Sequence, residues 1–198
     1  MESKKRFIAR IFYIVVFSGL FGWVYEFIFY YFNFGMDKFY WQGGNFLPWI
    51  NIYAYGALLI YLLTYKFTKN PWKVFFISVI STGILEFVSG YAIYTLLDGT
   101  RYWDYNKEIL NFMNIGGFVC LRSVLFFGVS GLILMYWIIP FLKKLEDKVN
   151  LKIYFNVALI LFSIVMIDEL YNLIFARLFS LPRMHDVYLK LGVNFMKL

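Results

Sequence analysis

The sequence predicts an all-α membrane protein with about five transmembrane helices. Of its 198 residues, 62% are hydrophobic and 24% are aromatic, while only 16% are charged. A soluble domain carries about 45–50% apolar and about 25% charged residues, so this composition does not fit one. The charges also separate long apolar runs, as expected for helices that cross a bilayer. We therefore expect a single membrane domain over residues 1–198.

Five apolar segments are long enough to span the hydrocarbon core, which takes about 20 helical residues. The first follows a basic start that resembles a signal peptide, but the apolar run is too long and has no small-residue cleavage site, so we expect a retained helix. Pro140, with Lys143 and Lys144 behind it, marks the predicted end of the fourth span. The predicted spans are residues 7–34, 47–65, 72–97, 115–142 and 153–178.

The distribution of basic residues predicts the orientation. Cytoplasmic loops of membrane proteins carry an excess of Lys and Arg. With the N-terminus inside, the inner segments hold eleven basic residues, whereas the two outer loops hold Lys38, Arg101 and Lys107. Five spans then place the C-terminus outside. The net charge of +7 is accordingly read as attraction to anionic lipid and not to nucleic acid.

Five ionisable residues stand out away from the ends of the predicted spans, where each costs about 2.5–3.5 kcal/mol and marks a functional hypothesis. Small residues share a helix face with two of them at four-residue spacing, which lets membrane helices approach closely, so these side chains should face the bundle interior. The small residues are Ser18 and Gly22 beside Glu26, and Ser78, Thr82 and Gly90 beside Glu86. Arg122 is expected to reach Glu86 or Glu26. The predicted intramembrane cluster consists of Glu26, Glu86, Arg122, Asp168 and Glu169, with Asn172 one turn beyond the last two.

Two interpretations of this cluster stay open. Arg122 could pair with one or two acids and simply hold the bundle together. Four acids against one arginine, however, leave an acidic excess that favours a ligand or ion pocket open to the outer side. The two outer loops would form its lid, although the first of them is equally well explained as an interfacial hairpin. The predicted lid residues are Trp41, Asn45, Tyr53, Arg101, Trp103, Asp104, Tyr105 and Asn114.

Several classes of chemistry find no support in the chain. It contains no Walker A loop, no GxSxG and no zinc-binding helix motif, so it is not expected to hydrolyse ATP itself. The single histidine, His185, argues against a histidine metal or haem site, and Cys120 alone forms no intrachain disulfide. We expect no metal, no cofactor and no nucleic-acid partner. Enzymatic activity is uncertain and is the less favoured expectation.

Four segments resemble the bacterial CmpB-like family, whose members are described as putative ABC-transporter type IV membrane proteins. They are "GWVYE" from Gly22, "GNFLPWINIYAYGALL" from Gly44, "LEFVSG" from Leu85 and "WDYN…NIGGFVCLRS" from Trp103. The resemblance covers roughly residues 19–142. It implies a multi-pass protein of the bacterial cytoplasmic membrane that is linked to transport, with an ATPase or another membrane subunit as a partner.

Three functions are compatible with these features. The first is a transport-associated or solute- or lipid-binding component, for which a cationic or zwitterionic amphiphile would match the acid excess and the aromatic rings. The second is a membrane-embedded enzyme that acts on a lipid-linked substrate, with a buried carboxylate as general base. The third is a structural or regulatory membrane subunit. Homo-oligomerisation is also compatible with the sequence, which determines neither substrate nor transport direction.

Overall fold

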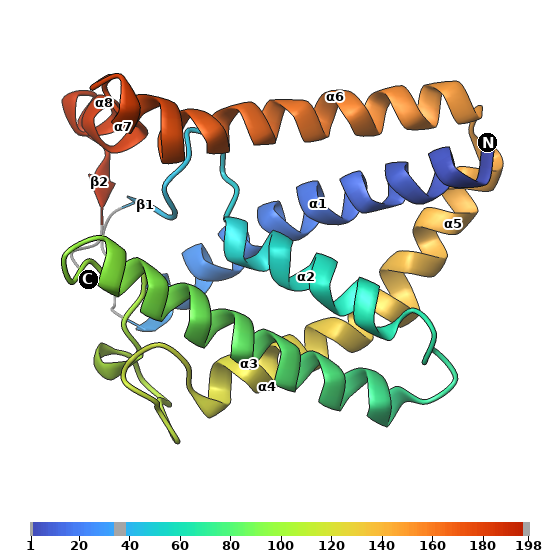
Figure 1. The fold of residues 1–198 in the computed structure, drawn as a ribbon, viewed down its shortest axis with the longest axis horizontal. Coiled ribbons are helices and arrows are strands. Elements are labelled where there is room, and N and C mark those ends of the chain that lie inside the picture. Colours follow the sequence, from blue (N-terminus) through green and yellow to red (C-terminus); the bar gives the residue numbers. More distant parts are fainter. Residues whose placement is uncertain (1, 34–38, 196–198) are drawn as a thin grey trace. The chain divides into compact units, whose positions relative to one another are not determined.

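The computed structural model describes residues 2–33 and 39–195, and most of this part is helical (Figure 1). Close contacts divide the chain into two compact units. Unit 1 comprises residues 1–55 and 145–197, and unit 2 comprises residues 56–144. The elements are α1 (Glu2–Asn33), β1 (Tyr40–Trp41), α2 (Asn51–Thr64), α3 (Pro71–Leu96), the 3₁₀ turn η1 (Tyr105–Lys107), α4 (Leu121–Ile133), the π-helical turn η2 (Leu134–Ile138), α5 (Ile139–Lys148), α6 (Leu151–Leu170), the π-helical turn η3 (Tyr171–Phe175), α7 (Ala176–Leu178), α8 (Met184–Lys190) and β2 (Asn194–Phe195).

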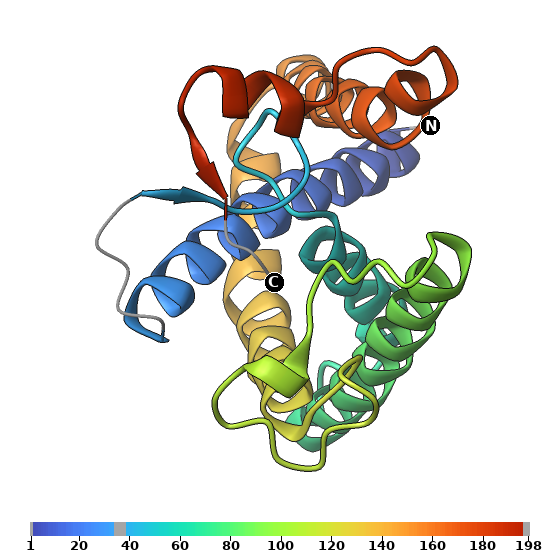
Figure 2. The ribbon, with the colours of Figure 1, turned by 90° about the vertical axis from the view of Figure 1, so that its left-hand side faces the viewer.

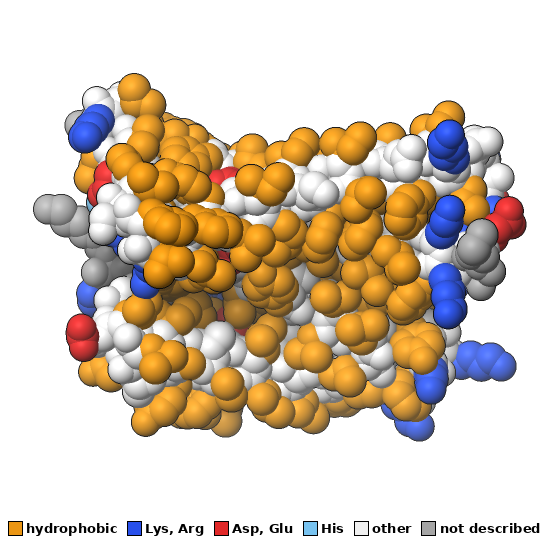
Figure 3. Space-filling model, turned by 45° about the horizontal axis from the view of Figure 1, so that its top comes forward, with side chains coloured by type: hydrophobic (Ala, Val, Ile, Leu, Met, Phe, Trp, Pro, Cys, Tyr) orange, Lys and Arg blue, Asp and Glu red, His pale blue; other side chains and the backbone are white. Residues whose placement is uncertain are grey.

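Among the described residues, four helical segments are long and apolar enough to cross a membrane. They are Lys4–Phe32, Pro71–Leu96, Leu121–Lys148 and Leu151–Leu178. Hydrophobic side chains dominate the visible surface in the space-filling view (Figure 3). The membrane class of the protein agrees with the prediction. The predicted second span appears as α2, an apolar helix whose 14 residues are fewer than the roughly 20 that a full crossing takes. The count of five crossings stays a prediction.

Two predicted spans begin later than expected. Helix α2 starts at Asn51 and not at residue 47, because the preceding segment is irregular and contains Gly43 at a φ of 77°. Helix α4 starts at Leu121 and not at residue 115. Gly116 and Gly117 have φ values of 61° and 81°, which an α-helix does not allow. The end of the first predicted span, Phe34, lies outside the described residues.

Pro140 does not end the helix of the fourth predicted span. The helix continues through α5 to Lys148. A proline inside an α-helix lacks its N–H and clashes with the carbonyl four residues earlier, which kinks or breaks the helix. Here the π-helical turn η2 ends at Ile138, two residues before Pro140. The Ile139 N–H is bonded to the Leu134 carbonyl. This local widening of the helix accommodates Pro140.

In unit 1, α1 and α6 pack side by side and run in the same direction (Figure 1). The Tyr13 hydroxyl of α1 donates to the Tyr154 carbonyl in the first turn of α6 at 3.1 Å. The Phe12 ring of α1 stacks on the Phe162 ring, farther along α6. The chain that follows α1 returns beside that helix. The Trp49 indole lies against Gly19, where only a glycine leaves room for the ring.

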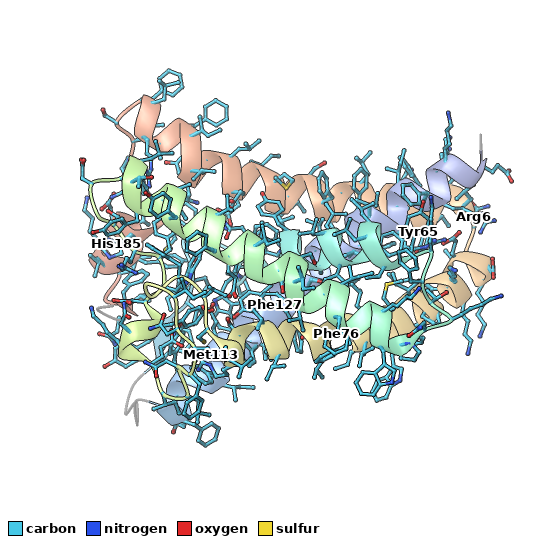
Figure 4. All side chains as sticks on the ribbon, turned by 60° about the horizontal axis from the view of Figure 1, so that its bottom comes forward. Arg6, Tyr65, Phe76, Met113, Phe127 and His185 are labelled. Carbon is cyan, nitrogen blue, oxygen red and sulfur yellow. The ribbon has the colours of Figure 1, made fainter. Side chains whose placement is uncertain are left out.

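In unit 2, α3 and α4 pack antiparallel. Ser78 contacts Gly131, Gly83 contacts Val124, and Glu86 contacts Ser123. The predicted stripe of small residues on α3 is confirmed, since all its members are buried; they are Ser78, Thr82, Glu86 and Gly90. Residues 97–120 form a long loop at the end of this helix pair (Figure 2). Phe127 is buried in unit 2, whereas Phe76 is exposed on α3 (Figure 4).

Candidate functional site

In unit 1, the buried acidic pair Asp168 and Glu169 near the end of α6 holds the segment that leads into α2. The Asp168 carboxylate accepts hydrogen bonds from the backbone N–H groups of Phe46 at 3.1 Å and Leu47 at 2.7 Å. The Glu169 carboxylate accepts from the side-chain amides of Asn45 at 2.8 Å and Asn51 at 2.9 Å.

This contact has a physical reason in the backbone of residues 42–50. These residues form neither helix nor strand, so secondary structure does not satisfy their N–H groups. Inside a membrane, irregular backbone persists only where protein groups or water satisfy it. The two carboxylates on α6 supply those acceptors, and Asn45 also donates to the Trp49 carbonyl at 3.3 Å.

Asn172 connects the acidic pair to the C-terminal part of unit 1. Its amide donates to the Asp168 carboxylate at 2.8 Å and to the Asp168 carbonyl at 3.0 Å. Its side-chain oxygen accepts from the backbone N–H of Met184, the first residue of α8, at 2.8 Å. Asn172 lies in the π-helical turn η3, and such turns within membrane helices frequently mark functional sites.

Aromatic side chains surround the same irregular segment. The Trp41 ring contacts Trp23 and Tyr188, and its indole donates to the Asn45 carbonyl. The Tyr188 hydroxyl donates to the Phe46 carbonyl at 2.8 Å. Burial raises the pKa of Tyr188, as does the nearby charge of Asp168, so this hydroxyl keeps its proton at neutral pH.

Two more residues of unit 1, Glu26 of the predicted cluster and Tyr53 of the predicted lid, lie on α1 and α2. Glu26 is half-buried on α1, one turn beyond Gly22. Tyr53 on α2 packs against Gly22, so closely that a Cβ there would meet its ring. Its ring also meets the Tyr25 ring edge-on, with centroids 6.0 Å apart. The stripe predicted on the first span therefore serves as a contact surface at Gly22.

In unit 2, the long loop closes over the carboxylate of Glu86. The Tyr105 hydroxyl donates to it at 2.6 Å, and the Ser123 hydroxyl on α4 donates to the other oxygen at 2.8 Å. Burial raises the pKa of Tyr105, and the charges of Glu86 and Glu108 raise it further. Tyr105 therefore stays protonated and serves as a donor.

Arg122 forms an ion pair with Glu108 of the long loop. Its guanidinium also lies over the Tyr105 ring, 5.5 Å from the ring centre. The sequence pointed to Glu86 or Glu26 as the partner and did not single out Glu108 or Ser123. The periodicity of a helix does not predict which loop residue its side chains contact, so only the tertiary structure identifies Glu108 as the partner of Arg122.

The remaining predicted lid residues hold the long loop together. Arg101 donates to the Gly116 carbonyl at 2.8 Å, and Asp104 accepts from the backbone and side chain of Asn106. The Trp103 indole donates to the Phe118 carbonyl at 2.9 Å. Asn114 donates to Asn106 and accepts from the Gly117 backbone.

The predicted cluster is thus divided between the two units. Glu86 and Arg122 lie in unit 2, whereas Glu26, Asp168, Glu169 and Asn172 lie in unit 1. A single pocket formed by all of them stays a prediction. Within the described ranges, no group of three His, Cys, Asp or Glu residues could hold a metal ion.

One electrostatic feature is common to both units. Within residues 2–33 and 39–195, the buried carboxylates of Glu86, Asp168 and Glu169 accept hydrogen bonds from amide, hydroxyl and backbone N–H groups, all of them neutral. None of the three forms an ion pair within this part of the chain. Hydrogen bonds from neutral donors stabilise a carboxylate but bring no opposite charge to it.

Comparison with known proteins places the chain in a family. The family model described as "Putative ABC-transporter type IV" matches residues 11–173, which is most of the chain. No curated protein and no solved structure matches it. The chain belongs to this ABC-transporter type IV family, in agreement with the resemblance carried by its four sequence segments.

Proposed function

We propose that this member of the ABC-transporter type IV family is a membrane-embedded, transport-associated component that binds a cationic amphiphile at the outer side of the bacterial cytoplasmic membrane. The observation that carries the proposal is the set of three buried carboxylates that have only neutral hydrogen-bond donors in the described part of the chain. A bound cation would compensate such charges, and the surrounding aromatic rings favour cations.

The direction of α1 and α6 supports five crossings. The two helices run parallel (Figure 1), so if both cross the membrane, α6 must begin on the side where α1 begins. Between α1 and α6, helix α3 and the α4–α5 segment account for two crossings. With only these two crossings in between, α6 would run antiparallel to α1. A further crossing is therefore needed, and α2 with its irregular entry segment is the available one. Basic residues then place the N-terminus inside and the C-terminus outside.

In this orientation, the carboxylates lie in the outer half of their helices. Glu86 is 15 residues, or roughly 22 Å, from the start of α3, and Asp168 is 17 residues, or roughly 26 Å, from the start of α6. The long loop of unit 2 lies on the outer side. A ligand would therefore approach Glu86 from outside, past Tyr105.

An ATPase partner has little surface available on the inner side. The inner connections are residues 65–70 and the two residues between α5 and α6. We propose that an ATPase contacts these turns and the basic start of α1, or does so through another subunit.

The proposal is tested with tetraphenylphosphonium as the cationic probe, on full-length protein in lipid nanodiscs. We expect saturable binding that Glu86→Gln or Glu169→Gln weakens at least tenfold, while neutral triphenylphosphine oxide does not compete. Asp98→Asn, at an exposed turn, is the matched control and should bind like the wild type.

A structural role is the second candidate, because every one of the three carboxylates is already hydrogen-bonded within its own unit. It would be favoured if no probe binds, yet Glu86→Gln and Glu169→Gln both lower the midpoint of thermal unfolding.

A further inference from the structure

The long loop of unit 2 exposes a compact group of apolar side chains at its tip, residues 109–115. Five of the seven residues in this loop tip are large and hydrophobic, with exposed fractions between 53% and 77%; they are Ile109, Leu110, Phe112, Met113 and Ile115. Met113 is labelled on the loop in Figure 4. Single exposed hydrophobic residues are ordinary, but a contiguous group of them indicates an interaction surface.

The two polar side chains of the loop tip, Asn111 and Asn114, are hydrogen-bonded to other residues of the loop. Asn111 donates to the Tyr105 carbonyl at 3.0 Å, and Asn114 donates to Asn106 at 2.8 Å. Asp104 and Glu108 are buried. In the loop tip, the polar side chains are therefore hydrogen-bonded within the loop while the apolar side chains are exposed, which is the reverse of what water favours.

The backbone of the loop tip is strained to keep this arrangement. Leu110 and Met113 have φ values of 54° and 52°, in the left-handed region that Gly, Asn and Asp occupy most easily. Asn111 and Asn114, which would tolerate that conformation better, follow them directly. Large apolar side chains at these strained positions bring no stabilisation when water surrounds them. Their exposure therefore indicates a nonaqueous environment.

Backbone hydrogen bonds fix the loop tip at the level where α4 begins. The N–H of Leu121, the first residue of α4, donates to the Phe112 carbonyl at 2.9 Å. The N–H of Ile115 donates to the Val119 carbonyl at 2.9 Å. The apolar tip is thus attached to the first turn of a helix that is long and apolar enough to cross a membrane.

We propose that the loop tip inserts into the lipid bilayer, among the headgroups and the first acyl carbons, at the end of α4 where that helix enters the membrane. The proposal rests on α4 crossing the membrane, as the proposed function requires. Lipid is favoured over a second protein because the backbone of the tip is hydrogen-bonded to the first residue of α4, a helix long and apolar enough to cross a membrane. The insertion would hold the loop against the membrane while Tyr105 and Arg122 stay in their contacts.

The experiment uses full-length protein in vesicles of phosphatidylcholine and phosphatidylglycerol. In a Cys120→Ala background, a single cysteine labelled with bimane is placed at Met113, at Lys107 or at Val129. Lys107→Cys is the matched control, since Lys107 is an exposed polar residue of the same loop. Val129→Cys reports on the exposed middle of α4. Each label is quenched separately with shallow doxyl-labelled lipid and with aqueous iodide.

We expect the label at position 113 to be quenched severalfold more by shallow doxyl lipid than the label at 107, and severalfold less by iodide. Strong iodide quenching at 113 would place the tip in water and overturn the proposal. Protection from both quenchers would indicate a protein partner or a second copy and would also overturn it.

Val129 separates the two possible failures. If the label at 129 is quenched by lipid with its doxyl group deep in the acyl chain, while the label at 113 is not quenched by shallow doxyl lipid, α4 crosses the membrane and only the loop-tip proposal fails. If neither is quenched by lipid, the membrane placement of α4 fails as well. Should Met113→Cys fold poorly, Phe112→Cys provides the same comparison from the neighbouring exposed side chain.

Discussion

The carboxylate of Asp168 accepts a hydrogen bond from the backbone N–H of Leu47 at 2.7 Å, across 121 positions of sequence. The neighbouring N–H, that of Phe46, binds the other oxygen. A charged acceptor thus replaces the secondary-structure partners that this irregular segment lacks, and four predictions about stability and packing follow from this and similar contacts.

Asp168→Asn should lower the free energy of unfolding by about 1–3 kcal/mol, because an amide replaces a carboxylate that accepts from two backbone N–H groups. The measurement is equilibrium unfolding in mixed detergent micelles, followed by circular dichroism. Asp98→Asn changes an exposed residue in the same way and should have no effect. Equal stability of the two variants would contradict this account of Asp168.

Arg10→Met should destabilise the protein by about 1–3 kcal/mol, because it removes the guanidinium that donates to the buried Glu146 carboxylate at 2.7 Å and leaves only Arg6, 3.8 Å from that carboxylate. The adjacent Asp147→Asn is the control. Asp147 is 80% exposed and lies 3.6 Å from Arg6, so its loss should cost less than about 1 kcal/mol. The same unfolding assay measures both, and a similar cost for the two changes would argue against a structural role for the Arg10–Glu146 pair.

Gly19→Ala should destabilise unit 1 although alanine is the better helix former. The propensity gain is about 0.8–1 kcal/mol. A Cβ at residue 19 would meet the indole of Trp49, which is buried and donates to the Val15 carbonyl at 3.1 Å. Overpacking of this kind costs about 1–3 kcal/mol, so the clash should exceed the propensity gain.

Gly44→Ala serves as the control for Gly19, because no atom lies within 4 Å of the position that its Cβ would take. It should leave the thermal midpoint unchanged. Tryptophan fluorescence should shift only in Gly19→Ala, which displaces Trp49. A stabilised Gly19→Ala variant would mean that α1 and Trp49 do not pack as described.

Tyr105→Phe should change how stability depends on pH. The pKa of Tyr105 is raised in the folded protein, mainly by burial. Above pH 10, a tyrosine in the unfolded chain loses its proton while Tyr105 in the folded chain keeps it, so the free energy of unfolding falls as the pH rises. This single group contributes at most about 1.4 kcal/mol per pH unit, and Tyr105→Phe removes that contribution.

Chemical unfolding between about pH 8 and about pH 11 measures this slope. Ser123→Ala is the matched control, because it removes the other hydroxyl bonded to Glu86 and keeps the phenol. Both variants should lose stability at pH 8, but only Tyr105→Phe should show a shallower alkaline decline. An unchanged slope in Tyr105→Phe would show that another group controls it.

The ends of the helices are where the sequence-based prediction and the structure differ most clearly. Pro140 was read as a terminus, since local rules treat an interior proline as a helix breaker, and the π-helical turn before it was not foreseen. The small-residue stripe of α3 was correctly identified, because four-residue spacing on a helix depends only on local geometry.

The sequence by itself determined the membrane class, the family and the positions of the unusual charges, because apolar length, composition and local motifs are properties of neighbouring residues. Only the tertiary structure decided the partners of those charges. Arg122 pairs with Glu108, Glu86 with Tyr105 and Ser123, and Asp168 with the backbone of an irregular segment. Each of these contacts joins a helix to a residue that no helical period relates to it, so only the folded chain brings the two together.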